Sequence, residues 1–270
     1  MGDKNKILWF EMPKQNNKMH TPLINIHAKK FDQVWDHFQN GFFPNPYDPK
    51  QVAGFEGRKT SLAINIPIRH TEIIDQIQRL SSFLGDFDDL CFMPKEYYHI
   101  TVKWIGFLVD RKEQEYDITT EILGSSIKKT EDIIRRISPF KISLKRINGL
   151  GSFVICEVDD NGIISNLQGR FHQDAIQIPI YSLEGEGWLP HLSLADIKSR
   201  KIIGKLQKDL RQFRDVELGK VLINEFNITK AILQESHLIC TPIILFAFEM
   251  SNRSFLNSAL TDTSKISSHL

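Results

Sequence analysis

Cysteine is scarce in this chain, and the three cysteines that occur lie far apart. Cys91, Cys156 and Cys240 are odd in number and form no CxxC pair, which excludes a disulfide framework or a cysteine-rich zinc site. The longest apolar run, PIILFAF, is far too short to span a bilayer. The N-terminal stretch MGDKNKILWFEMPKQ lacks the apolar core of a signal peptide. We therefore expect a reduced, cytoplasmic protein that does not associate with membranes.

A strong excess of either charge is also missing. The chain has 34 Lys and Arg against 33 Asp and Glu, a formal net charge of +1. This balance argues against a protein that holds nucleic acid through a strong overall positive field, and it leaves room for a local basic groove. No GxxxxGK[ST] loop, GxGxxG fingerprint or HExxH pair occurs in the sequence. We expect neither a cofactor nor a metal.

Composition divides the chain into three parts. Residues 1–58 are rich in turn formers, as in NGFFPNPYDPK, and contain one short helical pattern, FDQVWDHFQNG, that ends at an Asn-Gly pair. We interpret this part as an extension or cap. Residues 251–270 are polar and rich in serine, and we expect a flexible tail there. The remaining residues, 59–250, form the expected main domain.

Strand and helix patterns alternate twice within this domain. Apolar spacing predicts strands at 61–68, 96–104, 140–150, 152–159, 187–197, 220–235 and 238–249, and helices at 71–85, 118–137, 162–178 and 199–213. Each half has the order strand, helix, strand with His-x-Thr or His-x-Ser, helix, strand. In the first half, His99 lies 34 residues after Asn65, the middle of the first predicted strand. In the second half, His191 lies 35 residues after Cys156, which has the same position in its strand. The agreement predicts a duplicated unit with lobes at about 59–150 and 151–250.

The two histidine-bearing strands have the same two-faced pattern. Side chains alternate between the faces of a strand, so in YHITVKW we place His99, Thr101 and Lys103 on one face and the apolar residues on the other. In LPHLSLAD, His191 and Ser193 share a face in the same way. A polar face of this kind must lie toward water or a cleft, because burying unpaired polar groups is costly.

A pseudo-twofold arrangement of the halves would bring both polar faces to one groove. Two imidazoles can then divide into one base and one acid, since the ordinary pKa of histidine lies near neutrality. The hydroxyls of Thr101 and Ser193 can donate hydrogen bonds to phosphoryl oxygens. Base, acid and hydroxyl donors are what an in-line displacement at phosphorus requires.

The motifs HITV and HLSL, in the contexts FMPKEYYHITVKWIG and GWLPHLSLADI, resemble those of a known superfamily. They are similar to the paired H-x-[ST]-hydrophobic motifs of the two-histidine phosphoesterases. This superfamily includes 2′-5′ RNA ligase-like proteins and 2′,3′-cyclic-nucleotide phosphodiesterases. SLAINIPI also resembles the first strand of the family, and the resemblance covers roughly residues 60–250.

The resemblance implies an α+β fold, bilobal and pseudo-twofold, with two antiparallel sheets lining a central groove and helices outside. It implies metal-independent hydrolysis of phosphodiesters, or the reverse ligation, in RNA processing. His99 and His191 would be the acid/base pair, and Thr101 and Ser193 would bind phosphate. The substrate would be an RNA end or a nucleotide with a 2′,3′-cyclic or 2′,5′-linked phosphoester. The sequence departs from the family at Asp196, where many members have a basic residue, and in its long N-terminal part.

Four further residues are weaker site candidates. Lys103 shares the predicted face of His99 and would steer or bind phosphate, yet Ala195 occupies the matching position of the second motif. Tyr97, Phe153 and Trp188 are candidates for stacking on a nucleobase, because aromatic faces bind bases without sequence preference. Solvent exposure for the lysine and core packing for the aromatic residues remain open alternatives.

Two other classes of function stay open at this point. A non-catalytic RNA- or nucleotide-binding protein would use the same groove, although binding alone does not require both imidazoles. An interaction module would bind a partner protein through residues 1–58. We expect a monomer with enzymatic activity, and the sequence does not distinguish which histidine is the base.

Overall fold

The computed structural model describes residues 23–41, 57–85, 87–176, 178–179, 184, 188–232 and 243–249. The turn-rich segment NGFFPNPYDPK, beyond its first two residues, and the predicted tail 251–270 lie outside this part of the chain. No helix among the described residues has the length and apolar character needed to cross a membrane. Among the same residues, no three His, Cys, Asp or Glu side chains gather in a metal-binding cluster.

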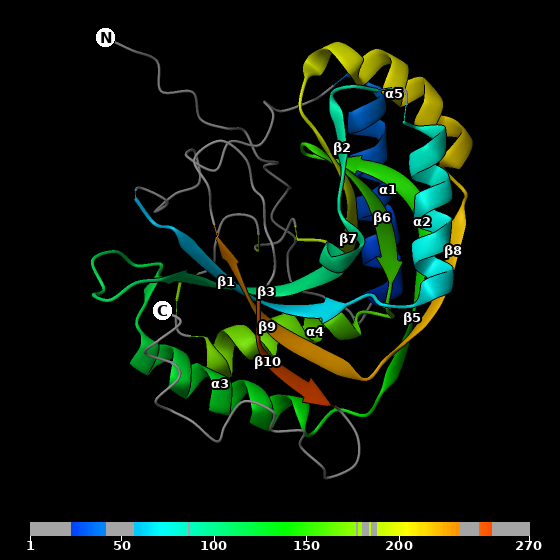
Figure 1. Ribbon diagram of the computed structural model, residues 1–270. Helices are drawn as coiled ribbons and strands as arrows, with labels where there is room; N and C mark the ends of the chain where they lie inside the picture. Colours follow the sequence, from blue (N-terminus) through cyan, green and yellow to red (C-terminus); the bar gives the residue numbers. More distant parts are fainter. Residues whose placement is uncertain are drawn as a thin grey trace, which may run out of the picture.

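Within the described residues, ten strands form one curled, mostly antiparallel sheet (Figure 1). Its main path runs in the order β10-β9-β1-β3-β7-β6-β5-β8, with β2 paired to β7 and β4 paired in parallel to β3. The bounds are β1 Thr60–Pro67, β2 Leu90–Phe92, β3 His99–Leu108, β4 Asp117–Ile118, β5 Phe140–Leu150, β6 Phe153–Asp159, β7 His191–Ile197, β8 Glu217–Ile223, β9 Glu225–Ile232 and β10 Ile243–Glu249.

The eight strands of the main path form two four-stranded halves that meet at a narrow seam. One residue pair, Ile100 with Leu192, joins β3 to β7 at the centre. Outward from the seam the two halves have corresponding strand orders, as the predicted duplication requires. The spatial halves differ from the predicted sequence lobes, however. β5, from the first lobe, pairs with β6 and β8, and β9, from the second, pairs with β1. Each lobe thus contributes its C-terminal part to the other half.

Five α-helices accompany the sheet: α1 Leu23–Gln39, α2 Thr71–Phe83, α3 Thr120–Ile134, α4 Ile163–Arg170 and α5 Ile203–Leu210. Single helical turns lie at Lys95–Tyr97, Arg200–Ile202 and Arg211–Phe213, and a π-helical turn, Phe171–Ala175, extends α4. Apolar side chains at helical spacing explain the burial of one face of each helix; in α2 these are Ile73, Ile77 and Leu80. The predicted helices therefore exist, but α1 begins eight residues before the predicted pattern at 31–41, and α4 ends at Arg170 and continues as a π-helical turn.

The helices also cross between the halves. α2 packs against β8 and α4 packs against β3, although each helix follows a strand of the opposite half. Figure 1 shows α3 and α4 on the side of β1, β9 and β10, and α2 on the side of β8. The main core lies between these helices and the sheet, and it includes Ile100, Val102, Leu192 and Leu194, the apolar sides of the two motif strands. This leaves the polar sides of both strands facing away from that core.

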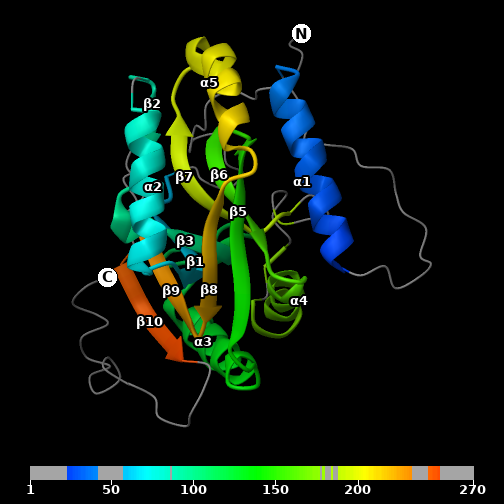
Figure 2. The same ribbon diagram turned by 90° about the vertical axis from the view of Figure 1, so that its right-hand side faces the viewer.

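Helix α1 packs on the opposite face of β5 and β6. Figure 2 shows α2 and α1 on opposite sides of these strands. Phe31 of α1 forms a small second core with Ile155 and Leu189. Because Ile155 pairs with Ser193 across β6 and β7, its side chain shares a face with Ser193. The described part of the N-terminal extension therefore covers part of the sheet face that carries the second motif.

Candidate active site

His99 is the first residue of β3, and only Tyr98 separates it from the turn Lys95–Tyr97. Its ring atom Nδ1 lies 2.6 Å from the carbonyl oxygen of Tyr97. A carbonyl oxygen only accepts hydrogen bonds, so Nδ1 carries the proton in the neutral ring. The other ring nitrogen, Nε2, is then the basic atom of His99.

His191 repeats this arrangement at the start of β7. Its Nδ1 lies 2.7 Å from the carbonyl oxygen of Leu189, again two residues earlier in the chain. The same argument makes Nε2 the basic atom of this ring as well. A hydrogen bond to a backbone carbonyl fixes both the tautomer and the direction of an imidazole, which is how acid/base histidines are oriented.

The seam between β3 and β7 brings the four motif side chains together. Ile100 lies opposite Leu192, and the strands are antiparallel. One further step along this register places His99 across from Ser193, and His191 across from Thr101. We call the sheet face that carries these four side chains the histidine face. All four are half-buried. By this register, each histidine lies across from a hydroxyl-bearing residue of the other strand.

Burial lowers the pKa of both histidines. For His99 burial outweighs the hydrogen bond to the Tyr97 carbonyl, and with the nearby His191 it lowers the pKa from 6.5 to about 4. For His191 burial lowers the pKa despite the hydrogen bond to the Leu189 carbonyl. Both rings are therefore neutral near pH 7 before a ligand binds. A neutral imidazole is ready to act as a base, and an anion between the rings would favour protonation of one of them.

Lys103 does not lie on the histidine face, and the prediction that it does is wrong. Thr101 pairs with Asn65 of β1, but Lys103 pairs with the next residue back, Ile64, because β3 has an extra residue at this point. Such a bulge reverses the alternation of side chains beyond it. Ile64 points into the core, and Lys103 is buried on that side in an ion pair with Glu184.

The three aromatic candidates occupy different surroundings. The Tyr97 ring meets the His99 ring edge to face, with 4.7 Å between the ring centres. Trp188 is half-buried against the main core. Phe153 packs against the second core, beside α1. Tyr97 is therefore in contact with a motif histidine, and base stacking stays a prediction for all three residues.

Several residues at or near the site escaped the sequence interpretation. Glu184 accepts hydrogen bonds from Lys103 Nζ and from the backbone NH of Trp104, and it lies shortly before β7. Asn65 and Asn227 lie beside Thr101 on the histidine face. Asn65 was recognised as a mid-strand position, but a single polar residue in an apolar strand carries no indication of its distant partners in the chain.

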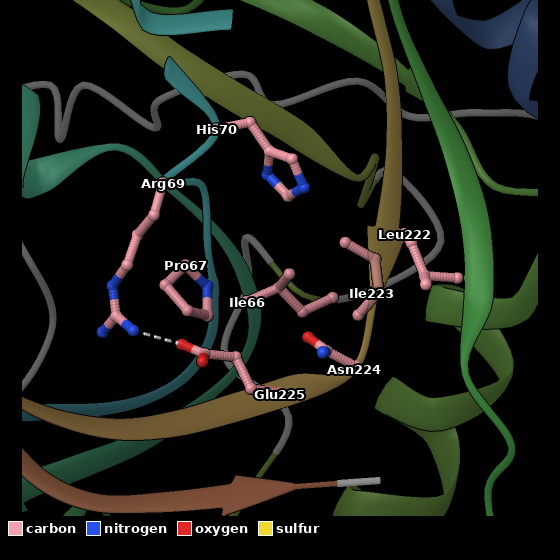
Figure 3. Close-up of a pocket in the computed structure, with 8 residues that line it drawn as sticks. All are labelled: Ile66, Pro67, Arg69, His70, Leu222, Ile223, Asn224 and Glu225. Carbon is pink, nitrogen blue, oxygen red and sulfur yellow. Dashed lines mark hydrogen bonds and ion pairs between the residues drawn. The ribbon is translucent and has the colours of Figure 1, made fainter. Parts of the chain in front are cut away.

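A small hollow elsewhere on the sheet is not part of this site. Figure 3 shows it at the end of β1 and the link between β8 and β9, where Arg69 donates to Glu225 at 2.7 Å. Its volume is about 80 Å³, whereas pockets for small ligands hold roughly 300–1,000 Å³. None of the four motif side chains lines it.

Comparison with solved structures finds proteins of similar fold. TT0787 of Thermus thermophilus superposes with a TM-score of 0.53 and 15% identity, over 72% of this chain and 100% of the other. A protein described as a phosphoesterase gives 0.50 and 13%, over 72% and 99%. LigT of E. coli with 3′-AMP gives 0.49 and 12%, over 72% and 99%. No protein-family model and no curated sequence matches.

At such low identity the likeness establishes the fold and nothing finer. The chain has the fold of TT0787 and of the phosphoesterase, as the sequence resemblance implied. The α+β, pseudo-twofold architecture predicted from the sequence is therefore confirmed, but the two predicted sheets are joined into one where β3 pairs with β7. The roles of the individual site residues rest on the geometry above.

Proposed function

We propose that this protein is a metal-independent phosphoesterase that uses His99 and His191 as a general acid/base pair. Its substrates are 2′,3′-cyclic or 2′,5′-linked phosphoesters of nucleotides or RNA ends. The observation that carries the proposal is the repeated geometry of the histidines. Each ring is fixed by an Nδ1 bond to the carbonyl two residues earlier, at 2.6 Å and 2.7 Å. By the register of β3 and β7, each also lies across from a hydroxyl-bearing residue of the other strand. A histidine with a purely structural role would not require a second histidine with the same hydrogen bond in the other half.

For a 2′,3′-cyclic phosphate, Nε2 of one histidine removes a proton from water as the water oxygen bonds to phosphorus. The bond from phosphorus to one ribose oxygen breaks, and the second histidine, protonated on Nε2, gives its proton to that oxygen. The product is a ribose monophosphate, and proton exchange with solvent resets the pair. Thr101 and Ser193 donate hydrogen bonds to the phosphoryl oxygens, where charge increases in the transition state.

The low pKa values of the free site fit this scheme. The base must be neutral near pH 7, and burial ensures that. The acid gains its proton when the phosphoester binds, because a negative charge between the two rings stabilises one imidazolium. The two histidines thus differ in protonation only when the substrate is bound.

The test is turnover of 2′,3′-cyclic nucleotides by His99→Ala and His191→Ala in the presence of a chelator. Each variant should lose a factor of about 10² to 10⁴ in kcat, the usual contribution of one acid or base. His37→Ala is the matched control, because its Nδ1 also bonds to a carbonyl, 2.8 Å from Gln33 O, on the exposed side of α1. Wild-type rates in both site variants would refute the proposal. Nucleotide binding without turnover would identify a binding protein instead.

A further inference from the structure

A row of polar side chains continues the histidine face from Thr101 onto the neighbouring strands. Asn65 of β1 lies directly opposite Thr101, and Asn227 of β9 lies directly opposite Asn65. Thr229 stands two residues beyond Asn227 on the same face. Neighbouring strands are about 4.8 Å apart, so Asn65 is one strand and Asn227 two strands from the phosphate-binding hydroxyl.

Both amides of this row are buried and incompletely paired. Asn65 is 3% exposed and Asn227 is 2% exposed. Asn65 Nδ2 donates to Thr229 Oγ1 at 2.6 Å, while Oδ1 of Asn65 and Oδ1 of Asn227 have no hydrogen-bond partner among the described residues. Turning the Asn65 amide around would satisfy its oxygen and leave its nitrogen unpaired. Proteins rarely leave buried polar atoms unpaired, because the lost hydrogen bonds to water are not replaced.

The other half of the sheet has an equivalent row, in which the buried amide is fully hydrogen-bonded. There Ser193 lies opposite Ile155, and Ile155 lies opposite Asn148. Asn148 is the counterpart of Asn227, and its amide is fully used: Nδ2 donates to Phe31 O at 3.0 Å and to Glu157 Oε1 at 2.8 Å, and Oδ1 accepts from Gly149 NH at 2.8 Å. Helix α1 therefore covers this row, and Phe31 packs on Ile155.

We propose that Asn65 and Asn227 form a subsite for the nucleoside part of the phosphoester, a refinement that rests on the function proposed above. Ribose hydroxyls and base amino groups donate hydrogen bonds to the two amide oxygens while the phosphate lies between the histidines. The nucleoside lies over β1 and β9, because α1 and Phe31 occupy the equivalent place over β5 and β6. Ile155 is the counterpart of Asn65 in the covered half, and an apolar residue at that position fits this assignment.

The test compares two ligands by calorimetry: adenosine 2′-monophosphate, which contains a nucleoside, and inorganic phosphate, which does not. Asn227→Leu keeps the size of the side chain and removes the amide. We expect about tenfold weaker binding of the nucleotide and unchanged binding of phosphate. Thermal stability should stay the same or rise, because an unpaired buried amide is removed. Asn224→Leu, an exposed asparagine in the β8–β9 link, is the matched control.

The inference fails if Asn227→Leu binds the nucleotide as the wild type does, or loses the nucleotide and phosphate to the same degree. It also fails if the wild type binds both ligands equally. Asn227→Ala serves the same comparison if the leucine variant does not fold. Since these measurements need no turnover, they are independent of the catalytic proposal. Loss of nucleotide binding in the variant of a protein that shows no turnover would keep the subsite and refute only the chemistry.

Discussion

The buried ion pair between Lys103 and Glu184 gives the sharpest test of how the two motifs are held together. The side chains are 1% and 7% exposed. Glu184 also accepts from the backbone NH of Trp104 at 2.5 Å, and its own carbonyl accepts from Gln168 Nε2 at 3.2 Å. This one residue therefore ties the segment before β7 to both β3 and α4.

Lys103→Met removes one charge of this pair and leaves the other buried. Breaking a buried pair in this way costs about 3–5 kcal/mol, because the remaining carboxylate loses its partner without regaining water. The free energy of unfolding should fall by that amount in urea titrations at pH 7. Adding Glu184→Gln should restore much of the loss, since glutamine carries no charge and still accepts from the Trp104 NH.

Lys145 supplies the control for this measurement. It forms an ion pair with Asp159 at 2.5 Å, but the two side chains are 41% and 32% exposed. Lys145→Met should cost about 0–1 kcal/mol, as exposed ion pairs do. Equal losses for Lys103→Met and Lys145→Met would refute the reasoning, and so would a double variant no more stable than Lys103→Met.

Two further predictions concern the histidines. The pKa of His99 is about 4 in the folded protein and 6.5 as its ordinary value, so the unfolded state binds more protons between these pH values. His99 therefore contributes stability above pH 6.5 that is lost as the pH falls toward 4, by up to about 3 kcal/mol. In a plot of unfolding free energy against pH, His99→Gln should flatten the slope between these pH values. An unchanged slope would contradict the lowered pKa of His99. Because the proposed nucleoside subsite lies on the β1 side of β3, we expect the ribose oxygen to leave beside His99. A 4-nitrophenyl phosphodiester, whose leaving group needs no acid, should then restore turnover in His99→Ala but not in His191→Ala, and equal restoration in both would contradict it.

The two histidine strands were predictable because their pattern is local. Between His99 and Thr101, and between His191 and Ser193, the register is regular, so alternation alone places each pair on one face. The spacing of the two motifs and the repeated order of elements predicted the duplicated fold. These features depend on residues close together in the chain.

The side chain of Lys103 was predicted on the wrong face of β3, because its direction depends on the neighbouring strand. Its direction is set by a bulge, and the bulge exists because β1 pairs Ile64 with Lys103 and Asn65 with Thr101. The position of an extra residue depends on the partner strand. The exchange of β5 and β9 between the halves and the Lys103–Glu184 pair are likewise properties of distant segments brought together. Only the pairing of the whole sheet specifies them.

A site built from two equivalent halves does not by itself define the orientation of a substrate, and α1 makes the halves different. With equivalent halves, a phosphoester would bind in two opposite orientations, and either histidine would face the leaving group. Here Arg146 and Arg214 pair with Asp32 of α1, and Phe31 packs on Ile155, so one half is covered by a helix from outside the repeat. The other half keeps Asn65 and Asn227 unpaired at their amide oxygens within the described residues. The extension thereby makes the two sides of the histidine face unequal. Under the proposed function, this inequality would give the substrate one orientation and the two histidines distinct roles.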